Sequence, residues 1–578
     1  MLKLFRILKR RDWLLAAFSV ALIVAQVWLD LKLPDYTQEI TLFLQMPHVN
    51  MNDVLLAGGN MLLCAVGSLL SSVLVALCVA HIATNFGAYL RLRMFDRVQA
   101  FSMQEIGGFS TASLITRSTN DITQVQMVLV MGLQVIVKAP ITAAWAIAKI
   151  WNKSWQWTFS TGVAIFILLV MVLIVMVTVM PKFKKLQKMT DELNRVTREN
   201  LTGIRVVRAY NAEAYQESKF TEANDNLTHT HLYTQRIMAT MMPTIALVMN
   251  GLSLAINWIG AYLVQKAPLE AKMELFSNMV TFLSYAMQVV ISFMLLVVVF
   301  IILPRASVSA RRIREVLDTE PKILDGTHNE GTCIGEVEFR NVTFSYPDAQ
   351  EPAISKISFK VRRGQTLAFI GATGSGKSTV INLIPRFYDA TSGEVLVDGR
   401  NVREYTQEAL RRKLGYISQK AVLFSGTVES NVDFGDNKCE NVLPALQTAQ
   451  AAEFVEKMPD GKDSYIAQGG TNLSGGQKQR ISIARAIARK PEILIFDDSF
   501  SALDYKTDRI LREALKTSCK DSTKIIVAQR IGTIRDADSI VVLEEGEIAG
   551  SGTHEMLMKT CEAYRQIAYS QLSKEELQ

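Results

Sequence analysis

The sequence predicts a fold of two parts, an α-helical membrane bundle followed by a soluble α/β domain. Of the 578 residues, 49% are hydrophobic, and long apolar runs fill the first half and are absent from the second. The second half instead alternates short apolar segments with glycine-rich turns and helical patterns, as α/β domains do. We therefore expect a transmembrane domain over residues 1–320, a linker over 321–335 and the soluble domain over 336–578.

Six apolar runs in the first half are each long enough to cross a bilayer, because about 20 helical residues span a hydrocarbon core of about 30 Å. The predicted spans are Trp13–Leu33, Val54–Ala83, Met127–Ile150, Trp157–Met180, Met241–Val264 and Met279–Leu303. The connections after the second and fourth spans, His81–Gln126 and Pro181–Thr240, are long, helical in pattern and rich in basic residues. The positive-inside rule places both connections in the cytoplasm, as two helical hairpins below the membrane.

Several charged residues in the membrane half need a separate interpretation. Lys149 and Lys153 lie beside a short outer loop, where the positive-inside rule disfavours basic residues. We base the topology on the two long connections instead, because they contain more basic residues. Lys138 lies within the third span, where a charge is costly and usually faces an interior; alternatively, its side chain reaches the cytoplasmic surface. Asp30 of the first span is expected near the outer water. We attribute the net charge of +7 to the basic residues that flank the membrane spans, and we expect no nucleic-acid partner.

The segment Gly371–Thr379 reads GATGSGKST and fits the phosphate-binding pattern G-x-x-x-x-G-K-[ST]. It follows the apolar run Gln365–Ile370, which predicts a buried strand, and it precedes a helical pattern. Glycines allow successive backbone N–H groups to converge on phosphate oxygens at the start of a helix. We expect Lys377 to reach the outer phosphates and Ser378 to hold Mg²⁺. The expected ATP-binding residues of this loop are Gly371, Thr373, Gly374, Ser375, Gly376, Lys377, Ser378 and Thr379.

Four further segments carry polar or aromatic residues at regular intervals. Tyr346, in FSYP, either stacks on an adenine or is an ordinary strand residue. Gln419 follows the strand-like LGYIS, where its amide could reach Mg²⁺ or an attacking water. Asp497 ends the buried run ILIFD beside the loop and can bind Mg²⁺ through water. A second phosphate-binding helix start is predicted at LSGGQ, whose expected binding residues are Ser474, Gly475, Gly476 and Gln477.

This ordered set of motifs resembles the nucleotide-binding domain of ABC transporters, and the six spans before it resemble a half-transporter of the type IV exporter kind. The resemblance covers nearly the whole chain. It implies that Tyr346 is the A-loop aromatic, Gly371–Thr379 the Walker A loop and Gln419 the Q-loop residue. It further implies a signature at Leu473–Gln477, a Walker B aspartate at Asp497 and a D-loop at Ser501–Asp504, with a catalytic role for Asp504. In this family two such domains meet head to tail, and each ATP lies between one Walker A loop and the other signature.

The sequence departs from this family pattern at two catalytic positions. Asp498 stands where the family has a glutamate that acts as general base. Gln529 stands where the family has a histidine that contacts the γ-phosphate, and it cannot carry an imidazolium charge. A third departure is the uncharged Gln468 ahead of the signature, where members often have a glutamate. All six histidines lie elsewhere, at His48, His81, His229, His231, His328 and His554.

The resemblance and its departures together imply the degenerate-site subunit of a heterodimeric bacterial ABC exporter, in the bacterial plasma membrane. Its own Walker B site, with Asp498 and Gln529, is expected to bind ATP and hydrolyse it poorly. Its signature is expected to complete the site of a second half-transporter that carries the glutamate and the histidine. The family implies amphipathic drugs or lipids as cargo. A slow homodimeric exporter and an ATP-gated channel or regulatory subunit remain alternatives; an importer subunit is disfavoured by the fusion of the two halves.

Overall fold

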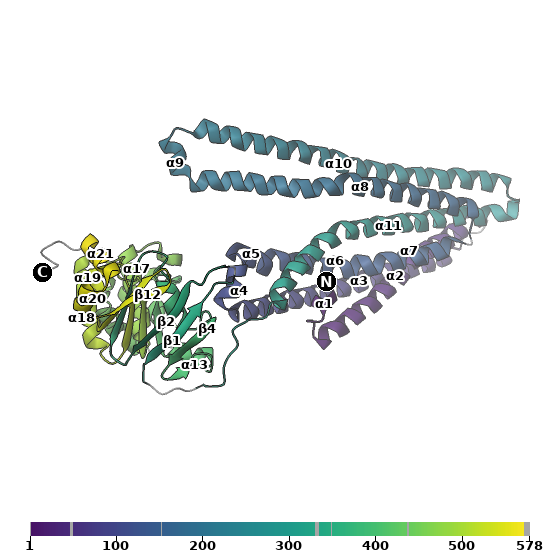
Figure 1. Cartoon of the computed structure of the whole chain (residues 1–578). Coiled ribbons are helices and arrows are strands. Elements are labelled where there is room, and N and C mark those ends of the chain that lie inside the picture. Colours follow the sequence, from purple (N-terminus) through teal and green to yellow (C-terminus); the bar gives the residue numbers. More distant parts are fainter. Residues whose placement is uncertain are drawn as a thin grey trace. The chain divides into compact units, whose positions relative to one another are not determined.

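The computed structural model describes residues 2–46, 50–151, 153–329, 334–347, 349–435 and 439–571. It divides into two compact units, the first formed by Met1–Val98 and Thr111–Asp318, the second by Gln99–Ser110 and Thr319–Gln578 (Figure 1). The short segment Gln99–Ser110 thus belongs to the second unit, although the sequence placed it within the transmembrane domain. Residues 330–333 of the predicted linker 321–335 lie outside the described residues, and so does His48.

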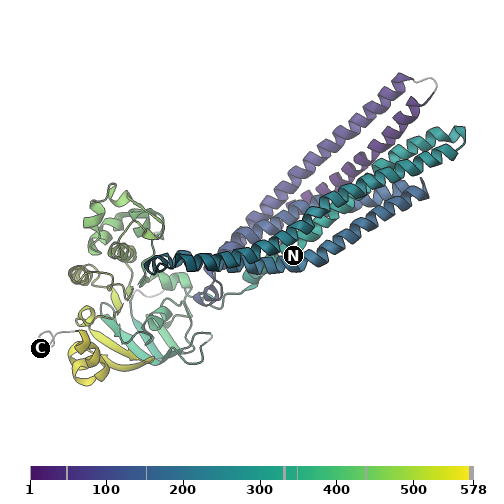
Figure 2. The same ribbon diagram turned by 90° about the horizontal axis from the view of Figure 1, so that it is seen from above.

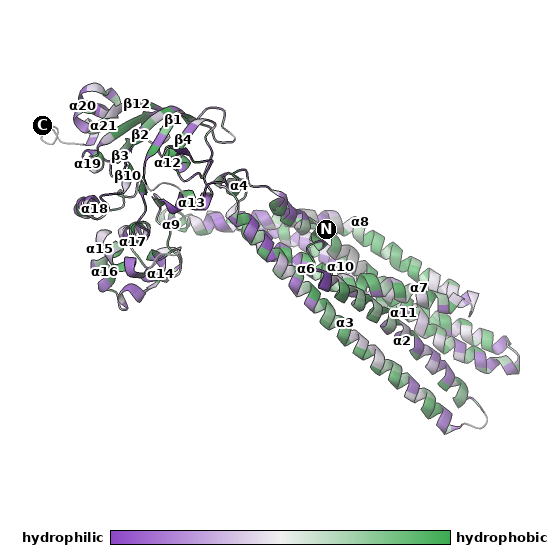
Figure 3. Cartoon of the chain, turned by 90° about the horizontal axis from the view of Figure 1, so that it is seen from below, coloured by the Kyte–Doolittle hydropathy of each residue, from purple (hydrophilic) through white to green (hydrophobic). Residues whose placement is uncertain are grey.

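The first unit consists of long helices. Six of those described are long and apolar enough to cross a membrane, which confirms the six predicted spans; they are Arg10–Leu44, Met51–Gln99, Thr111–Trp151, Trp155–Thr202, Glu213–Lys266 and Leu269–Leu296. Hydrophobic residues predominate along them (Figure 3). The helices are α1 (Leu2–Phe5), α2 (Arg10–Leu44), α3 (Met51–Gln99), α8 (Trp155–Thr202), α9 (Ile204–Ala209), α10 (Glu213–Lys266) and α11 (Leu269–Asp318), with the third span built from several segments.

Several of these helices continue well beyond the length that a bilayer requires. Helix α8 has 48 residues and α10 has 54, and the two lie side by side and are joined by the short α9 (Figures 1 and 2). This is the second predicted hairpin. The first follows α3, through α4 (Met103–Gly108) and α5 (Thr111–Thr116). Ser102 begins α4 by accepting a hydrogen bond from the amide of Gln104, and its own amide donates to Glu105.

The third span is not a uniform α-helix, a feature that the sequence did not predict. After α5 it contains a π-helical turn at Arg117–Asp121, then α6 (Ile122–Met131), a second π-helical turn at Gly132–Val137, and α7 (Lys138–Trp151). π-Helical turns inside α-helices are rare and occur frequently at functional sites. The bundle packs around buried aromatic residues, with the rings of Trp157 and Phe282 5.3 Å apart.

The second unit contains two main sheets. The larger sheet has the order β12-β11-β3-β10-β9-β6 and the smaller one β2-β1-β4-β5. In the larger sheet, β3, β6, β9, β10 and β11 are mutually parallel, so their carboxyl ends meet at one edge. The strands are β1 (Val337–Phe344), β2 (Ile354–Val361), β3 (Thr366–Ile370), β4 (Ser392–Val397), β5 (Arg400–Asn401), β6 (Leu414–Ile417), β7 (Gly426–Thr427), β8 (Tyr465–Ile466), β9 (Ile493–Asp497), β10 (Thr523–Val527), β11 (Ser539–Glu544) and β12 (Glu547–Gly552).

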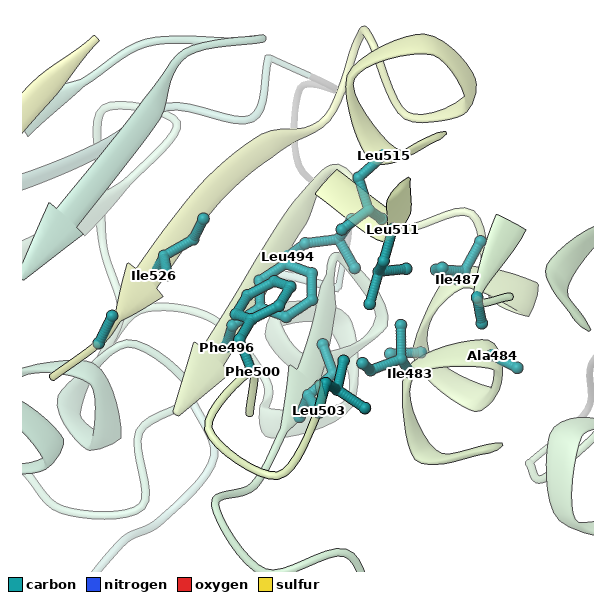
Figure 4. Close-up of a cluster of buried hydrophobic side chains, with 14 of the residues drawn as sticks. Ile483, Ala484, Ile487, Leu494, Phe496, Phe500, Leu503, Leu511, Leu515 and Ile526 are labelled. Atoms are coloured by element: carbon teal, nitrogen blue, oxygen red, sulfur yellow. The ribbon is translucent and has the colours of Figure 1, made fainter. Parts of the chain in front are cut away.

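The central strands are buried on both faces because helices cover them. Every residue of β9 and β10 is buried; the apolar run of β9 predicts this, whereas β10 begins with the polar residues Thr523 and Lys524. Phe496 and Leu494 of β9 pack against Ile483 and Leu511 of two covering helices (Figure 4). The helices of this unit, after α4, are α12 (Lys377–Leu383), α13 (Gln407–Arg412), α14 (Val428–Val432), α15 (Val442–Thr448), α16 (Ala452–Glu456), α17 (Gly475–Ala488), α18 (Tyr505–Ser518), α19 (Ile531–Ile534), α20 (His554–Thr560) and α21 (Glu562–Gln571).

Candidate nucleotide-binding site

The predicted phosphate-binding loop connects β3 to α12. Gly371 and Gly376 have φ values of 156° and 91°, in the region that favours glycine. A Cβ atom at Gly376 would lie 2.8 Å from the carbonyl oxygen of Ala353, and one at Gly371 would clash with the carbonyl of Leu543. These two positions therefore require glycine.

Lys377 lies over this loop. Its Nζ donates hydrogen bonds to the carbonyl oxygens of Gly371, at 2.8 Å, and Ala372, at 2.6 Å, and to Ser375 Oγ at 3.2 Å. Burial lowers the pKa of Lys377, while the nearby charges of Asp498 and Asp497 act in the opposite direction. The ammonium group is thus held at the mouth of the loop, where nucleotide phosphates are expected.

Ser378 and Asp497 form the expected metal edge of the site. Ser378 Oγ donates to Asp497 Oδ1 at 2.9 Å, and the hydroxyl of Tyr416 contacts Asp497 Oδ2 at 3.4 Å and Asn382 Oδ1 at 3.0 Å. Burial raises the pKa of Asp497. A hydroxyl and a carboxylate fit Mg²⁺, which usually takes one or two protein oxygens together with phosphates and water. The sequence analysis did not predict Tyr416 as a site residue, although it lies within the LGYIS segment.

Three of the four predicted catalytic residues come together around one carboxylate oxygen. Asp498 Oδ2 accepts hydrogen bonds from Gln529 Nε2 at 2.9 Å and from Gln419 Nε2 at 3.3 Å. Asp498 has a φ of 46°, and its amide donates to the carbonyl of Val527 at 3.0 Å, which joins the end of β9 to the end of β10. Burial raises the pKa of Asp498. The acid and two neutral amides therefore form one hydrogen-bonded group.

The fourth predicted catalytic residue, Asp504, caps a helix instead. It begins α18, where its carboxylate accepts from the amide of Thr507 at 2.9 Å and from the Thr507 hydroxyl at 2.7 Å. These hydrogen bonds, the backbone one first, lower the pKa of Asp504. Among the described residues, the side-chain hydrogen bonds of Asp504 go to Thr507 and not to the Asp498 group. Gln468 is likewise separate, exposed in a short 3₁₀ turn.

The signature segment lies on an exposed part of the chain. Ser474 begins α17, with the amide of Gln477 donating to Ser474 Oγ at 3.3 Å and the Ser474 amide donating to Gln477 Oε1 at 2.9 Å. Gly475 is exposed, and a Cβ atom there would meet nothing within 4 Å. The predicted capped helix start is present, and its surface is open to a binding partner.

Tyr346 lies close to the first turn of α12. Its hydroxyl is 3.1 Å from Thr379 Oγ1, and its ring meets the rings of Phe344 and Tyr388 edge-on at 4.9 Å and 5.5 Å. The residue remains 37% exposed. This geometry suits the stacking role predicted for it.

The C-terminal helix α21 contributes to the site, which no sequence motif indicates. A hollow of about 710 Å³ beside the loop is lined by residues of Gly371–Ser375 and by Gln529, Gln566, Ser570 and Gln571. Gln571 Nε2 donates to the carbonyl of Gln529 at 2.7 Å, and Gln571 Oε1 accepts from the amide of Ile531 at 2.9 Å. Gln571 thus holds the turn that presents Gln529 to Asp498.

Known proteins share both the sequence and the fold. Residues 354–501 match the family model described as ABC transporter, and residues 17–294 match the ABC transporter transmembrane region. An uncharacterized ABC transporter ATP-binding protein of Mycobacterium tuberculosis is 38% identical over 89% of this chain and 87% of its own length. An ATP-dependent lipid A-core flippase of Syntrophus aciditrophicus is 31% identical over 87% of this chain and 83% of its own length.

The structure of a bacterial Atm1-family ABC exporter with ATP bound has a similar fold, with a TM-score of 0.81 at 24% identity, over 98% of this chain and 100% of that one. The predicted fold class, a six-helix transmembrane bundle fused to an α/β nucleotide-binding domain, is therefore confirmed. The chain belongs to the ABC transporter family, as an ATP-driven exporter half-transporter with six membrane-spanning helices and a cytoplasmic ATP-binding domain.

Proposed function

We propose that this chain is the degenerate-site subunit of a heterodimeric exporter, in which its own Walker A loop holds ATP and Mg²⁺ but hydrolyses ATP poorly. The observation that carries the proposal is the hydrogen-bonded group at Asp498. A general base must direct a lone pair at the attacking water. Asp498 is shorter than glutamate by one methylene, about 1.5 Å, and catalysis is sensitive to misplacement on that scale. Its Oδ2 is already engaged by Gln419 and Gln529.

Gln529 supports the same proposal. Its amide can donate a hydrogen bond to a phosphate oxygen, but it carries no positive charge at any pH. Its Nε2 donates to Asp498 at 2.9 Å, and Gln571 holds the backbone that follows, through the Gln529 carbonyl and the Ile531 amide. Both the proposed general base and the proposed γ-phosphate contact are thereby weakened at one site. ATP binding is expected to survive, because Tyr346, Lys377 and Ser378 retain suitable geometry.

The intact signature implies a second role. Ser474 and Gly475 lie exposed at a capped helix start, which is suited to phosphate binding at the Walker A loop of another half-transporter. We propose that hydrolysis occurs mainly there, with a glutamate and a histidine supplied by the partner. As cargo we propose amphipathic drugs or lipids, supported by the lipid substrate in the names of the flippase relatives.

The test is a comparison of two variants in the assembled pair. Ser474→Ala is expected to reduce ATP hydrolysis nearly to zero, whereas Asp498→Asn is expected to change it only modestly. Conductance through the reconstituted pair without competition by substrates would favour an ATP-gated channel. If Asp498→Asn abolished hydrolysis while Ser474→Ala changed it only modestly, the proposal that hydrolysis occurs mainly at the partner's Walker A loop would be refuted.

A further inference from the structure

The hydroxyl of Tyr416 lies between the end of β9 and the helix α12 that follows the phosphate-binding loop. It donates to Asn382 Oδ1 of α12 at 3.0 Å, and it lies 3.4 Å from Asp497 Oδ2 at the end of β9. Tyr416 belongs to β6 and pairs in register with Ile495 of β9. A side chain from a third element therefore reaches both the expected metal-binding carboxylate and the helix that carries Ser378.

These contacts close a ring of hydrogen bonds that starts and ends on α12. Ser378 Oγ donates to Asp497 Oδ1 at 2.9 Å, and Tyr416 connects Asp497 Oδ2 to Asn382. Ser378 and Asn382 are four residues apart on α12, so their side chains lie on the same face of this helix. Each oxygen of the Asp497 carboxylate thus has a hydroxyl partner, and the two partners together limit rotation of the carboxylate.

Packing holds the Tyr416 ring in this place. The ring meets Phe387 edge-on, with the two ring centroids 5.4 Å apart, and the guanidinium of Arg411 lies 5.6 Å from the centroid of Phe387. Asp497 is 7% exposed, so water competes little for its oxygens. Hydrogen bonds are electrostatically stronger in such a buried environment than in water. The Tyr416 hydroxyl is therefore a fixed donor beside a buried carboxylate.

The Tyr416 hydroxyl has a single proton for two acceptors. Hydrogen bonds between two oxygens are usually about 2.5–3.0 Å long. Asn382, at 3.0 Å, is therefore the main acceptor, and Asp497, at 3.4 Å, is the weaker one. Asn382 and Asp497 thus compete for this proton, and loss of the Asn382 amide would leave the whole proton to Asp497.

A bound Mg²⁺ is sensitive to the orientation of the carboxylates around it. It requires nearly octahedral geometry and keeps several waters, so a carboxylate that binds it through water must direct its oxygens at those waters. Removal of a residue that orients a metal ligand through a hydrogen bond typically weakens metal affinity by about 10- to 100-fold. The long contact from Tyr416 to Asp497 places its expected effect at the lower end of this range.

We propose that Tyr416 is a positioning residue of the Mg²⁺ site, which acts through Asp497 by orienting its carboxylate. Tyr416 affects binding of the metal and not of the nucleotide, because the hydrogen bonds of its hydroxyl within the described part of the chain go to Asn382 and Asp497 and not to the phosphate-binding loop. This inference rests on the proposed binding of ATP and Mg²⁺ at this chain's own Walker A loop, and it adds a residue outside the motifs.

The test measures the affinity of the full-length chain in lipid nanodiscs for the non-hydrolysable analogue AMP-PNP by calorimetry, once with Mg²⁺ and once with EDTA. Since Mg²⁺ and the analogue change each other's affinity by the same factor, the ratio of the two affinities reports metal binding at the site. Tyr416→Phe removes only the hydroxyl. It is expected to lower this ratio about tenfold and to leave the affinity in EDTA unchanged.

Two further variants separate hydrogen bonding from packing. Asn382→Ala is expected to keep or raise the ratio, because the proton of Tyr416 is then left to Asp497. Tyr405→Phe is the matched control, since the buried Tyr405 also loses a hydroxyl that donates a hydrogen bond, here to the carbonyl oxygen of Val397 at 3.1 Å. It is expected to leave both affinities unchanged.

Several results would overturn the inference. An unchanged ratio in Tyr416→Phe would leave its hydroxyl without a role at the metal, and an equal fall in Tyr405→Phe would make the effect nonspecific. Equal losses of affinity with Mg²⁺ and with EDTA would assign Tyr416 to packing alone. A fall in Asn382→Ala as large as in Tyr416→Phe would show that the hydroxyl acts through α12 and not through Asp497. Failure of the proposed function is distinguishable, because the wild-type chain would then bind the analogue no better with Mg²⁺ than with EDTA, and the inference would fail with it.

Discussion

Replacing Asp498 by glutamate and Gln529 by histidine should restore hydrolysis at this chain's own Walker A site. The glutamate extends the carboxylate by about 1.5 Å, toward the place of the attacking water. The histidine removes the amide that donates to Asp498 Oδ2 at 2.9 Å and supplies a group that can carry positive charge. A positioned general base contributes about 10²- to 10⁴-fold, so the double variant should hydrolyse ATP at least about 100-fold faster at this site.

The assay requires a partner subunit whose Walker B glutamate is changed to glutamine, so that hydrolysis at this chain's site dominates. Each single variant is expected to recover less activity than the double variant, because either residue alone leaves the site incomplete. Asp521→Glu, at a position whose side chain is 86% exposed, adds the same methylene on the surface and should leave the rate unchanged. A double variant no faster than the wild type would refute the reasoning, as would a wild-type site that is already fast.

Three further perturbations test individual contacts. Lys377→Met should weaken ATP binding to this site at least tenfold in titration calorimetry, because a charged donor at the loop is lost; unchanged affinity would remove Lys377 from the phosphate site. Gln571→Ala should speed hydrogen exchange at the amide of Ile531, because this amide loses its acceptor, and the control Gln566→Ala should not. Wild-type protection of the Ile531 amide in Gln571→Ala would show that Gln571 does not hold this turn. Asp498→Asn should raise the melting temperature of the chain at pH 7, because burial raises the pKa of Asp498 and its ionised form destabilises the fold. That gain in melting temperature should vanish below about pH 4, where the Asp498 carboxyl is protonated in both the folded and the unfolded chain. A gain that persists there would show that the ionised carboxylate does not destabilise the fold.

The order of apolar residues along the chain predicted most of the buried strands and all six membrane spans. The run before Asp497 forms a fully buried strand, and the run before Gly371 forms a strand that is buried from Leu367 to Ile370, because each matches the length of a central parallel strand. Parallel strands bring their carboxyl ends to one edge, so residues at strand ends, such as Asp498 and Gln529, meet there. The six spans were likewise predictable, since a bilayer sets their minimum length.

Contacts between distant segments were not predictable from local pattern. Nothing near Gln571 indicates that its side chain meets the turn after β10, because no sequence signal reports this packing of α21. The pairing of Asp30 with Lys138 depends on the mutual rotation of two helices, and Asp504 has local helix-capping partners that the family motif does not reveal. The segment Gln99–Ser110 joined the second unit through tertiary packing.

The most direct test of the central claim is the ATPase rate of this chain purified alone in lipid, and then together with the half-transporter encoded beside it. The account predicts negligible hydrolysis by the chain alone, because Asp498 and Gln529 serve both sites of a homodimer, and rapid hydrolysis by the pair. A comparable rate for the chain alone would contradict the account. It would show that an aspartate and a glutamine suffice at these positions, and the slow homodimeric exporter would take its place.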